Sequence, residues 1–329
     1  MPLRTYVELV SRDDDLVRVY SEGVGGGVLC YHLGEEARRG RWLDYLQGVT
    51  HVLGLQRGFD LHVRSTLPLG GGLSSSASFL VAVLRGLREA FELAVDDRTL
   101  ALLAHRAETE FVGAPVGMMD PFAVHFADET SAILLDVRDL SFERIPLPPA
   151  LGLVILDSGV HHKLTAQGGY RTRRAECEAA ASRLGVRALR ELGDGDAARI
   201  AALPDPLDRR VRHVVEENNR VLAAAQALRG GDLEALGALF AASHRSMRDD
   251  YEVSVPAVDA LVARAQADPA VYGARLTGGG FGGSVVIATD AAQRAEVAAR
   301  IAGAAGGSVR ILVPSPGGRT SSVLAMDPE

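Results

Sequence analysis

The sequence is poor in cysteine and has no long apolar run, and these two absences exclude several classes of protein. Only Cys30 and Cys177 occur in 329 residues, too few for a disulfide framework or a four-cysteine zinc site. Two reduced thiols are typical of a cytoplasmic protein. No segment approaches the ~18 apolar residues of a membrane span, and no apolar signal core follows Met1. We therefore expect a cytoplasmic protein without a membrane partner.

Positive charge is also scarce. The 35 lysines and arginines are outnumbered by 42 acidic residues, which gives a net charge of −7. A nucleic-acid binder would carry a basic surface, so we expect no nucleic-acid partner. The length suits two domains of ~100–200 residues each. Prolines at positions 146, 148 and 149 interrupt the pattern, so we predict domains at 1–148 and 149–329.

Hydrophobic periodicity predicts an α+β fold in both halves. In the first half we expect strands at 5–10, 17–20, 59–64 and 132–137, and helices at 41–53, 80–91 and 99–111. The second half begins with an apolar strand at 151–156. Further expected elements are helices at 169–184, 208–228, 232–248, 257–267 and 291–304, and strands ending near 277, at 284–288 and at 308–313. Strand, helix, strand, strand, helix, strand is the order of a small α+β sandwich.

A glycine- and serine-rich segment, residues 68–78, joins a predicted strand to an amphipathic helix. Its glycines allow close approach of the backbone to a ligand. The following helix start offers free amide groups and the positive end of the helix dipole, which suit a phosphate. A serine hydroxyl there can cap the helix or bind a metal ion. It is not a Walker A loop, because no Gly-Lys-Ser/Thr follows. A tight turn with an N-cap is the structural alternative.

A second glycine cluster covers residues 276–284. Gly278, Gly280 and Gly283 match the dinucleotide fingerprint formally, but a strand follows where that fingerprint requires a helix. Two interpretations stay open: a wide hairpin loop, or a second anion-binding loop that closes on the first.

Two acidic residues of interest lie between the two glycine clusters in the sequence. Glu108 is near the end of a predicted helix, and a Gly/Pro loop leads to Asp120. Phosphoryl transfer needs one carboxylate for a metal ion and a second facing the nucleophile hydroxyl. The alternatives are a solvated glutamate and a turn-forming aspartate. Tyr170, at a predicted helix start, can hydrogen-bond a small polar ligand. The alternative is a solvated basic helix face, with Arg173 and Arg174 close to Glu176 and Glu178.

These motifs together resemble the GHMP small-molecule kinases, and within them the galactokinase family. Residues 68–78 resemble the second family motif and residues 276–283 the third. The galactokinase marks are Phe-Val-Gly at 111–113 with Gly-Met-Met-Asp at 117–120, Tyr-Arg-Thr-Arg-Arg-Ala-Glu-Cys at 170–177, Arg-Asp-Asp-Tyr-Glu-Val-Ser at 248–254 and Tyr-Gly-Ala-Arg-Leu-Thr at 272–277. The resemblance runs from about residue 3 to the end of the chain.

The resemblance implies a fold, a reaction and a site. The fold is two α+β domains, a ribosomal-protein-like N-terminal domain and a ferredoxin-like C-terminal domain. The reaction is ATP- and Mg²⁺-dependent phosphorylation of D-galactose to galactose 1-phosphate, by a monomer or weak oligomer. The implied phosphate-loop residues are Gly70, Gly71, Gly72, Leu73, Ser74, Ser75 and Ser76, with Gly278, Gly279 and Gly280 in the third loop.

The remaining roles follow residue by residue. Ser76 and Glu108 would hold Mg²⁺, and Asp120 would face the anomeric hydroxyl of the sugar as general base or electrostatic partner. Tyr170 would contact the sugar. Ser21 and Trp42 fall where the family places residues near the nucleotide.

The chain departs from the family pattern at two places. Pro121 follows Asp120 where the family usually has glutamine, so we expect altered loop geometry there. The first family motif, Gly-Arg-Val-Asn-Leu-Ile-Gly-Glu-His, is not present in the sequence. We therefore expect slow turnover from the chain as written. Two alternatives remain: another GHMP sugar 1-kinase, for arabinose, a uronic acid or an amino sugar, or an inactive galactokinase-like sensor.

Overall fold

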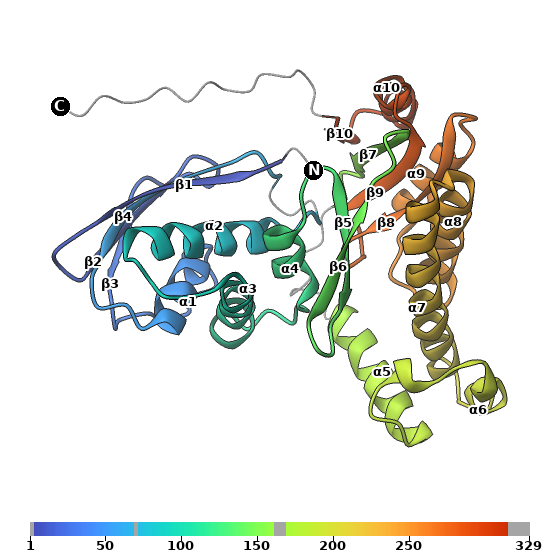
Figure 1. The fold of residues 1–329 in the computed structure, drawn as a ribbon, viewed down its shortest axis with the longest axis horizontal. Helices are drawn as coiled ribbons and strands as arrows, with labels where there is room; N and C mark the ends of the chain where they lie inside the picture. The colour runs from blue at the N-terminus through green and yellow to red at the C-terminus, as the bar shows by residue number, and fades with distance from the viewer. Residues whose placement is uncertain (1–2, 69–71, 161–168, 315–329) are drawn as a thin grey trace.

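The computed structural model describes residues 3–68, 72–160 and 169–314. Its first unit is a four-stranded sheet with helices on one face (Figure 1). The sheet order is β1-β4-β2-β3, and β2 runs parallel to β4. The strands are β1 (Thr5–Ser11), β2 (Leu16–Ser21), β3 (Leu29–His32) and β4 (Phe59–Ser65). The helices are α1 (Leu43–Leu53), α2 (Ser75–Ala90) and α3 (Asp97–Arg106).

The core of this unit lies between the sheet and α2. Successive side chains of a strand point to opposite faces, and the inward residues Val17, Val19 and Leu61 are almost fully buried. They pack in one cluster with the apolar face of α2, where Leu80 and Leu84 are fully buried. This packing fixes the start of α2, and therefore the serines there, relative to the sheet.

The second unit has the strand order β10-β7-β9-β8, with all neighbours antiparallel. One set of helices connects β7 to β8, and α10 connects β9 to β10. This is the ferredoxin-like order, so the expected two-domain α+β fold is confirmed. The elements are β7 (Leu151–Asp157), α5 (Gly169–Leu184), α6 (Ala197–Ala201), α7 (Leu207–Gly230), α8 (Leu233–Asp249), α9 (Pro256–Gln266), β8 (Val271–Thr277), β9 (Ser284–Asp290), α10 (Arg294–Ala305) and β10 (Arg310–Val313).

A hairpin of β5 (Ser131–Asp136) and β6 (Ser141–Pro146) lies between the two units (Figure 1). It contacts α4 (Met119–Phe126) on one side and α7 on the other. Two ion pairs attach it to the second half of the chain, Arg190–Asp136 at 2.6 Å and Arg229–Glu143 at 2.6 Å.

Four helices and strands are missing from the sequence expectation. Neither β3, β6 nor α6 was predicted, and Asp120, expected at the end of a loop, lies in α4. The side chains of β6 are almost all exposed, so its sequence has no apolar alternation to reveal it. Pairing with β5 makes β6 a strand.

In the described part of the chain, every helix is too short or too polar to cross a lipid bilayer.

Candidate active site

Two glycine loops from different units meet at the site. Gly72 precedes α2, and Gly278 begins the loop between β8 and β9; both have left-handed backbones, with φ of +70° and +87°. A Cβ on Gly278 would lie 2.9 Å from the carbonyl oxygen of Gly72, a distance that side chains do not tolerate. The loop at 278–283, which includes Gly279 and Gly280, is therefore a hairpin loop that also closes on the first loop. That it binds an anion stays a prediction.

Leu73 anchors the first loop. Its side chain is 7% exposed and packs with Ile155 of β7 and Val313 of β10, both from the second unit. The loop is thus attached to both units at once. Gly70 and Gly71 lie outside the described residues.

The start of α2 presents hydroxyl and amide groups to this region. Ser74 is at the N-cap position with a left-handed φ of 56° and makes no side-chain cap, so the expected capping role is wrong for Ser74. Its hydroxyl instead lies near Asp120 and lowers the pKa of that carboxyl group. The first turn holds no acidic residue, so the positive end of the helix dipole, at Ser75 and Ser76, is free to attract an anion.

Glu108 lies in a π-helical turn, Ala107–Val112, where the sequence predicted a continuing α-helix. Such turns are rare and frequent at functional sites. The side chain is 3% exposed. Burial raises the pKa of Glu108, a hydrogen bond from Ser76 opposes that shift, and the charge of Asp120 adds to it. The structure therefore brings Ser76, Glu108 and Asp120 into one region, and their roles in binding metal and sugar stay predictions.

Asp120 occupies the first turn of α4. Burial raises its pKa, and the hydrogen bond with Ser74 partly offsets the shift. Pro121 follows in the same turn and is buried. Proline is tolerated there because first-turn amides have no intrahelical acceptor. Asp120 therefore lies in a helix and not in the expected loop, and an effect of Pro121 on its geometry relative to the family stays a prediction.

The carboxylates fit a magnesium ion. Among residues 3–68, 72–160 and 169–314, no arginine forms an ion pair with Glu108 or Asp120, although both are largely buried. A buried carboxylate is costly without a cation. The same ranges contain no group of three or more His, Cys, Asp or Glu side chains able to hold a metal ion. Mg²⁺ commonly uses one or two carboxylates and substrate phosphates instead, so the donor set suits Mg²⁺ with a nucleotide.

Ser21 and Trp42 border the same region. Ser21 is buried at the end of β2 and pairs with Val63, near the end of the strand that leads into the first glycine loop. Trp42 packs edge-on against Phe79 of α2, with ring centroids 6.3 Å apart. Ser21 thus lies beside the strand that leads into the loop, and Trp42 lies beside the helix that follows it; that they border a nucleotide stays a prediction.

Tyr170 is in the first turn of α5, beside the third loop. A Cβ on the preceding Gly169 would lie 2.5 Å from the ring of Phe281, which belongs to that loop. Within the described residues, no hydrogen bond joins Tyr170 to Asp120, so their common contact with a sugar stays a prediction. Arg174 pairs with Glu178 on the exposed face of α5, which confirms the solvated-face interpretation for this residue. His161 to Gly168 lie outside the described residues.

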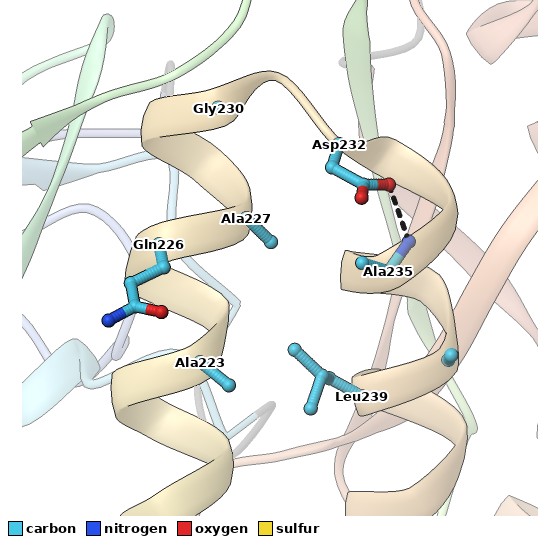
Figure 2. Close-up of a pocket in the computed structure, with 8 residues that line it drawn as sticks. Ala223, Gln226, Ala227, Gly230, Asp232, Ala235 and Leu239 are labelled. Carbon is cyan, nitrogen blue, oxygen red and sulfur yellow. Dashed lines mark hydrogen bonds between the residues drawn. The ribbon is translucent and has the colours of Figure 1, made fainter.

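A separate cavity of about 730 Å³ lies between α7 and α8 (Figure 2). Ala223, Ala227, Ala235 and Leu239 line it, and Asp232 there caps α8 by accepting from the amide of Ala235 at 2.9 Å. No predicted site residue lines this cavity, so it is not the predicted site.

The sequence analysis missed Gly48 of α1. A Cβ built on Gly48 would lie 2.9 Å from the carbonyl oxygen of Ala107, immediately before Glu108. Glycine thus lets α1 approach the π-helical turn. In the sequence, the only signal for Gly48 is that it is a glycine in the interior of a predicted helix.

We expect Gly48→Ala to displace Glu108. The added methyl group contacts backbone, which cannot rotate away, so the π-helical turn must shift. Alanine is otherwise preferred over glycine in helices by about 0.5–1 kcal/mol. Gly303→Ala in α10 is the matched control, because a Cβ there meets nothing within 4 Å. Titration of Mg²⁺-dependent nucleotide binding should show weakening for Gly48→Ala only; equal behaviour of the two variants would contradict the assignment.

Comparison with known proteins agrees with this geometry. The GHMP kinase N-terminal domain family matches residues 43–127, and the GHMP kinase C-terminal family matches residues 224–308. The galactokinase of Chloroflexus aggregans is 42% identical over 341 residues, covering 99% of this chain and 87% of that protein. The human galactokinase is 45% identical over 259 residues, covering 76% of this chain and 65% of that protein.

A solved structure extends the similarity to three dimensions. The galactokinase of Lactococcus lactis, crystallised with galactose, superposes with a TM-score of 0.89 at 31% identity, covering 94% of this chain and 84% of that one. Identity above 40% over nearly the whole chain, two matched family domains and a shared fold leave one assignment. The chain belongs to the GHMP kinase family, in its galactokinase branch.

Proposed function

We propose that this protein transfers the terminal phosphoryl group of ATP to the anomeric hydroxyl of D-galactose, giving galactose 1-phosphate and ADP. The observation that carries the proposal is the pairing of Ser74 with Asp120 and of Ser76 with Glu108 at the start of α2. The glycine- and serine-rich loop at the start of α2 therefore lies beside the carboxyl groups of Glu108 and Asp120.

Each group has a physical role in this reaction. Amides and hydroxyls at residues 72–76 bind and orient the phosphates, aided by the helix dipole. Ser76 and Glu108 hold Mg²⁺, which neutralises charge on the phosphates when bound. Asp120 accepts the proton of the sugar hydroxyl or stabilises its developing charge. Because burial raises its pKa, Asp120 is a stronger base than an ordinary carboxylate. Tyr170 orients the sugar, and Ser21 and Trp42 border the nucleotide.

A substrate panel tests the proposal. The purified chain is incubated with MgATP and, separately, galactose, arabinose, galacturonic acid and galactosamine, and ADP release is coupled to a spectrophotometric readout. We expect the highest kcat/KM with galactose. A higher value with another sugar would favour a different GHMP sugar 1-kinase. Nucleotide binding without turnover of any sugar would favour a sensor.

We further propose domains at 1–148 and 149–329, and a monomer or weak oligomer acting in the cytoplasm. The division is supported by the two four-stranded sheets, since each takes all its strands from one side of this boundary. The cytoplasm is supported by two free cysteines. Sedimentation of the purified chain would test the oligomeric state.

A further inference from the structure

Arginines gather around a short backbone segment, residues 249–252, which runs from the last residue of α8 into the loop that follows. They come from α5 and α7, and they donate to successive carbonyl oxygens of the segment. The donor–acceptor pairs are Arg209–Asp249 at 2.9 Å, Arg210–Asp250 at 2.5 Å and Arg173–Tyr251 at 2.6 Å. Side chains far away in the sequence thus fix the path of this segment, of which residues 250–252 lie outside any helix or strand.

Carboxylates complete the cluster. Glu252 accepts from Arg209 at 2.6 Å and from Arg210 at 2.6 Å. Arg210 also pairs with Glu176 at 2.6 Å, and Glu176 pairs with Arg173 at 2.9 Å. The side chain of Arg210 is 1% exposed. The neighbouring arginines, first Arg209 and then Arg210, lower the pKa of Glu252 to about 2, so this carboxylate is charged at neutral pH.

Stability alone does not explain such a cluster. Desolvation of buried charges offsets much of their attraction, and well-packed apolar residues often stabilise a core as well. The ion pairs also fix the positions of the groups that they join, because each planar guanidinium constrains the geometry of several acceptors at once. Glu252 is held with a left-handed φ of 53°, a backbone conformation that a non-glycine residue seldom adopts without such restraint.

The next residue, Val253, connects the cluster to the third glycine loop. Its side chain is 5% exposed, and its carbonyl oxygen accepts from the amide of Phe281 at 2.6 Å. A Cβ on Gly280 would lie only 2.5 Å from the same oxygen. The loop therefore rests directly on Val253, and its other side meets Gly72 of the first loop through Gly278.

We propose that Arg210 and Glu252 are positioning residues, which hold the third glycine loop through Val253 and so keep both loops in the geometry that binds MgATP. The inference rests on the proposed function only in assigning a nucleotide to these loops. In the described residues, neither side chain forms a hydrogen bond or ion pair with Ser76, Glu108 or Asp120.

Equilibrium MgATP binding, measured by calorimetry without sugar, tests the proposal in Glu252→Gln. This variant keeps the shape of the side chain and removes its charge. We expect the MgATP affinity to fall about 10- to 100-fold, the range typical when a residue that only orients a binding group is changed. Glu176→Gln should act in the same direction. Glu178→Gln is the matched control, because Glu178 lies on α5 like Glu176 but pairs only with the exposed Arg174. The MgATP affinity of this variant should equal that of the parent protein.

A double-mutant cycle adds a second measurement. Gly280→Ala forces the loop away from Val253 directly. If Glu252 acts through that contact, the fold-loss of MgATP affinity in the double variant should be smaller than the product of the fold-losses in the two single variants.

Thermal unfolding is measured on every variant. A lower Tm for Glu252→Gln with unchanged MgATP affinity would overturn the proposal and leave the cluster a structural role, as would independent, multiplying losses in the cycle. Absence of galactose turnover alongside normal MgATP binding would overturn only the proposed function. A parent chain that binds no MgATP would overturn both.

Discussion

Asp120→Asn should lower turnover of galactose at least ~100-fold, the lower end of what loss of a general base costs. Asparagine has nearly the same shape, so α4 and its contact with Ser74 should persist. The amide cannot accept the proton of the sugar hydroxyl, and it carries no charge to stabilise the attacking oxygen. Steady-state kinetics should show the loss in kcat, with small changes in the KM values for ATP and galactose.

Asp128→Asn is the matched control. Asp128 lies two residues after α4 and caps a turn, accepting from the amide of Thr130 at 2.8 Å. Asparagine serves equally well in such turns, so kcat should be unchanged. Near-normal turnover of Asp120→Asn would mean that Asp120 only forms the first turn of α4.

Glu108→Gln should abolish the Mg²⁺ dependence of nucleotide binding while making the protein without nucleotide more stable. Burial raises the pKa of Glu108 above the ordinary glutamate value. Between those two values the folded protein holds a proton that the unfolded chain has lost. Stability therefore falls as pH rises through that window, and at neutral pH the buried charge is destabilising. A neutral glutamine removes this cost together with the metal ligand.

Two measurements check this expectation. Titration of ATP binding with Mg²⁺ should show no Mg²⁺ response in Glu108→Gln and a weaker one in Ser76→Ala. The fold of Ser76→Ala should survive, because Ser76 does not cap α2 and alanine is the most favourable residue within a helix. Thermal unfolding without nucleotide should give a higher Tm for Glu108→Gln at pH 7. The difference should shrink as the pH falls through the titration of Glu108. A retained Mg²⁺ response in both variants would remove the metal assignment.

The sequence by itself determined most of the order of helices and strands, and it predicts the chemistry of the site. Alternating residues such as Val17, Val19 and Leu61 predict half-buried strands, because one face of each strand must be apolar. The glycine and serine segment predicts a phosphate loop, because backbone approach and free amides are local properties. The long motifs around Asp120 and Tyr170 carry the family resemblance, and similarity over 99% of the chain confirmed it.

Only the tertiary structure decided how these parts act on one another. Nothing local in the sequence shows that Gly278 closes on Gly72, that Gly48 leaves room for the turn carrying Glu108, or that Arg210 is buried between two glutamates. These contacts join residues far apart in the chain, and their energies depend on burial and on charges brought close by folding. For the same reason the sequence did not show that Asp120 and Pro121 lie in a helix, residues 119–126.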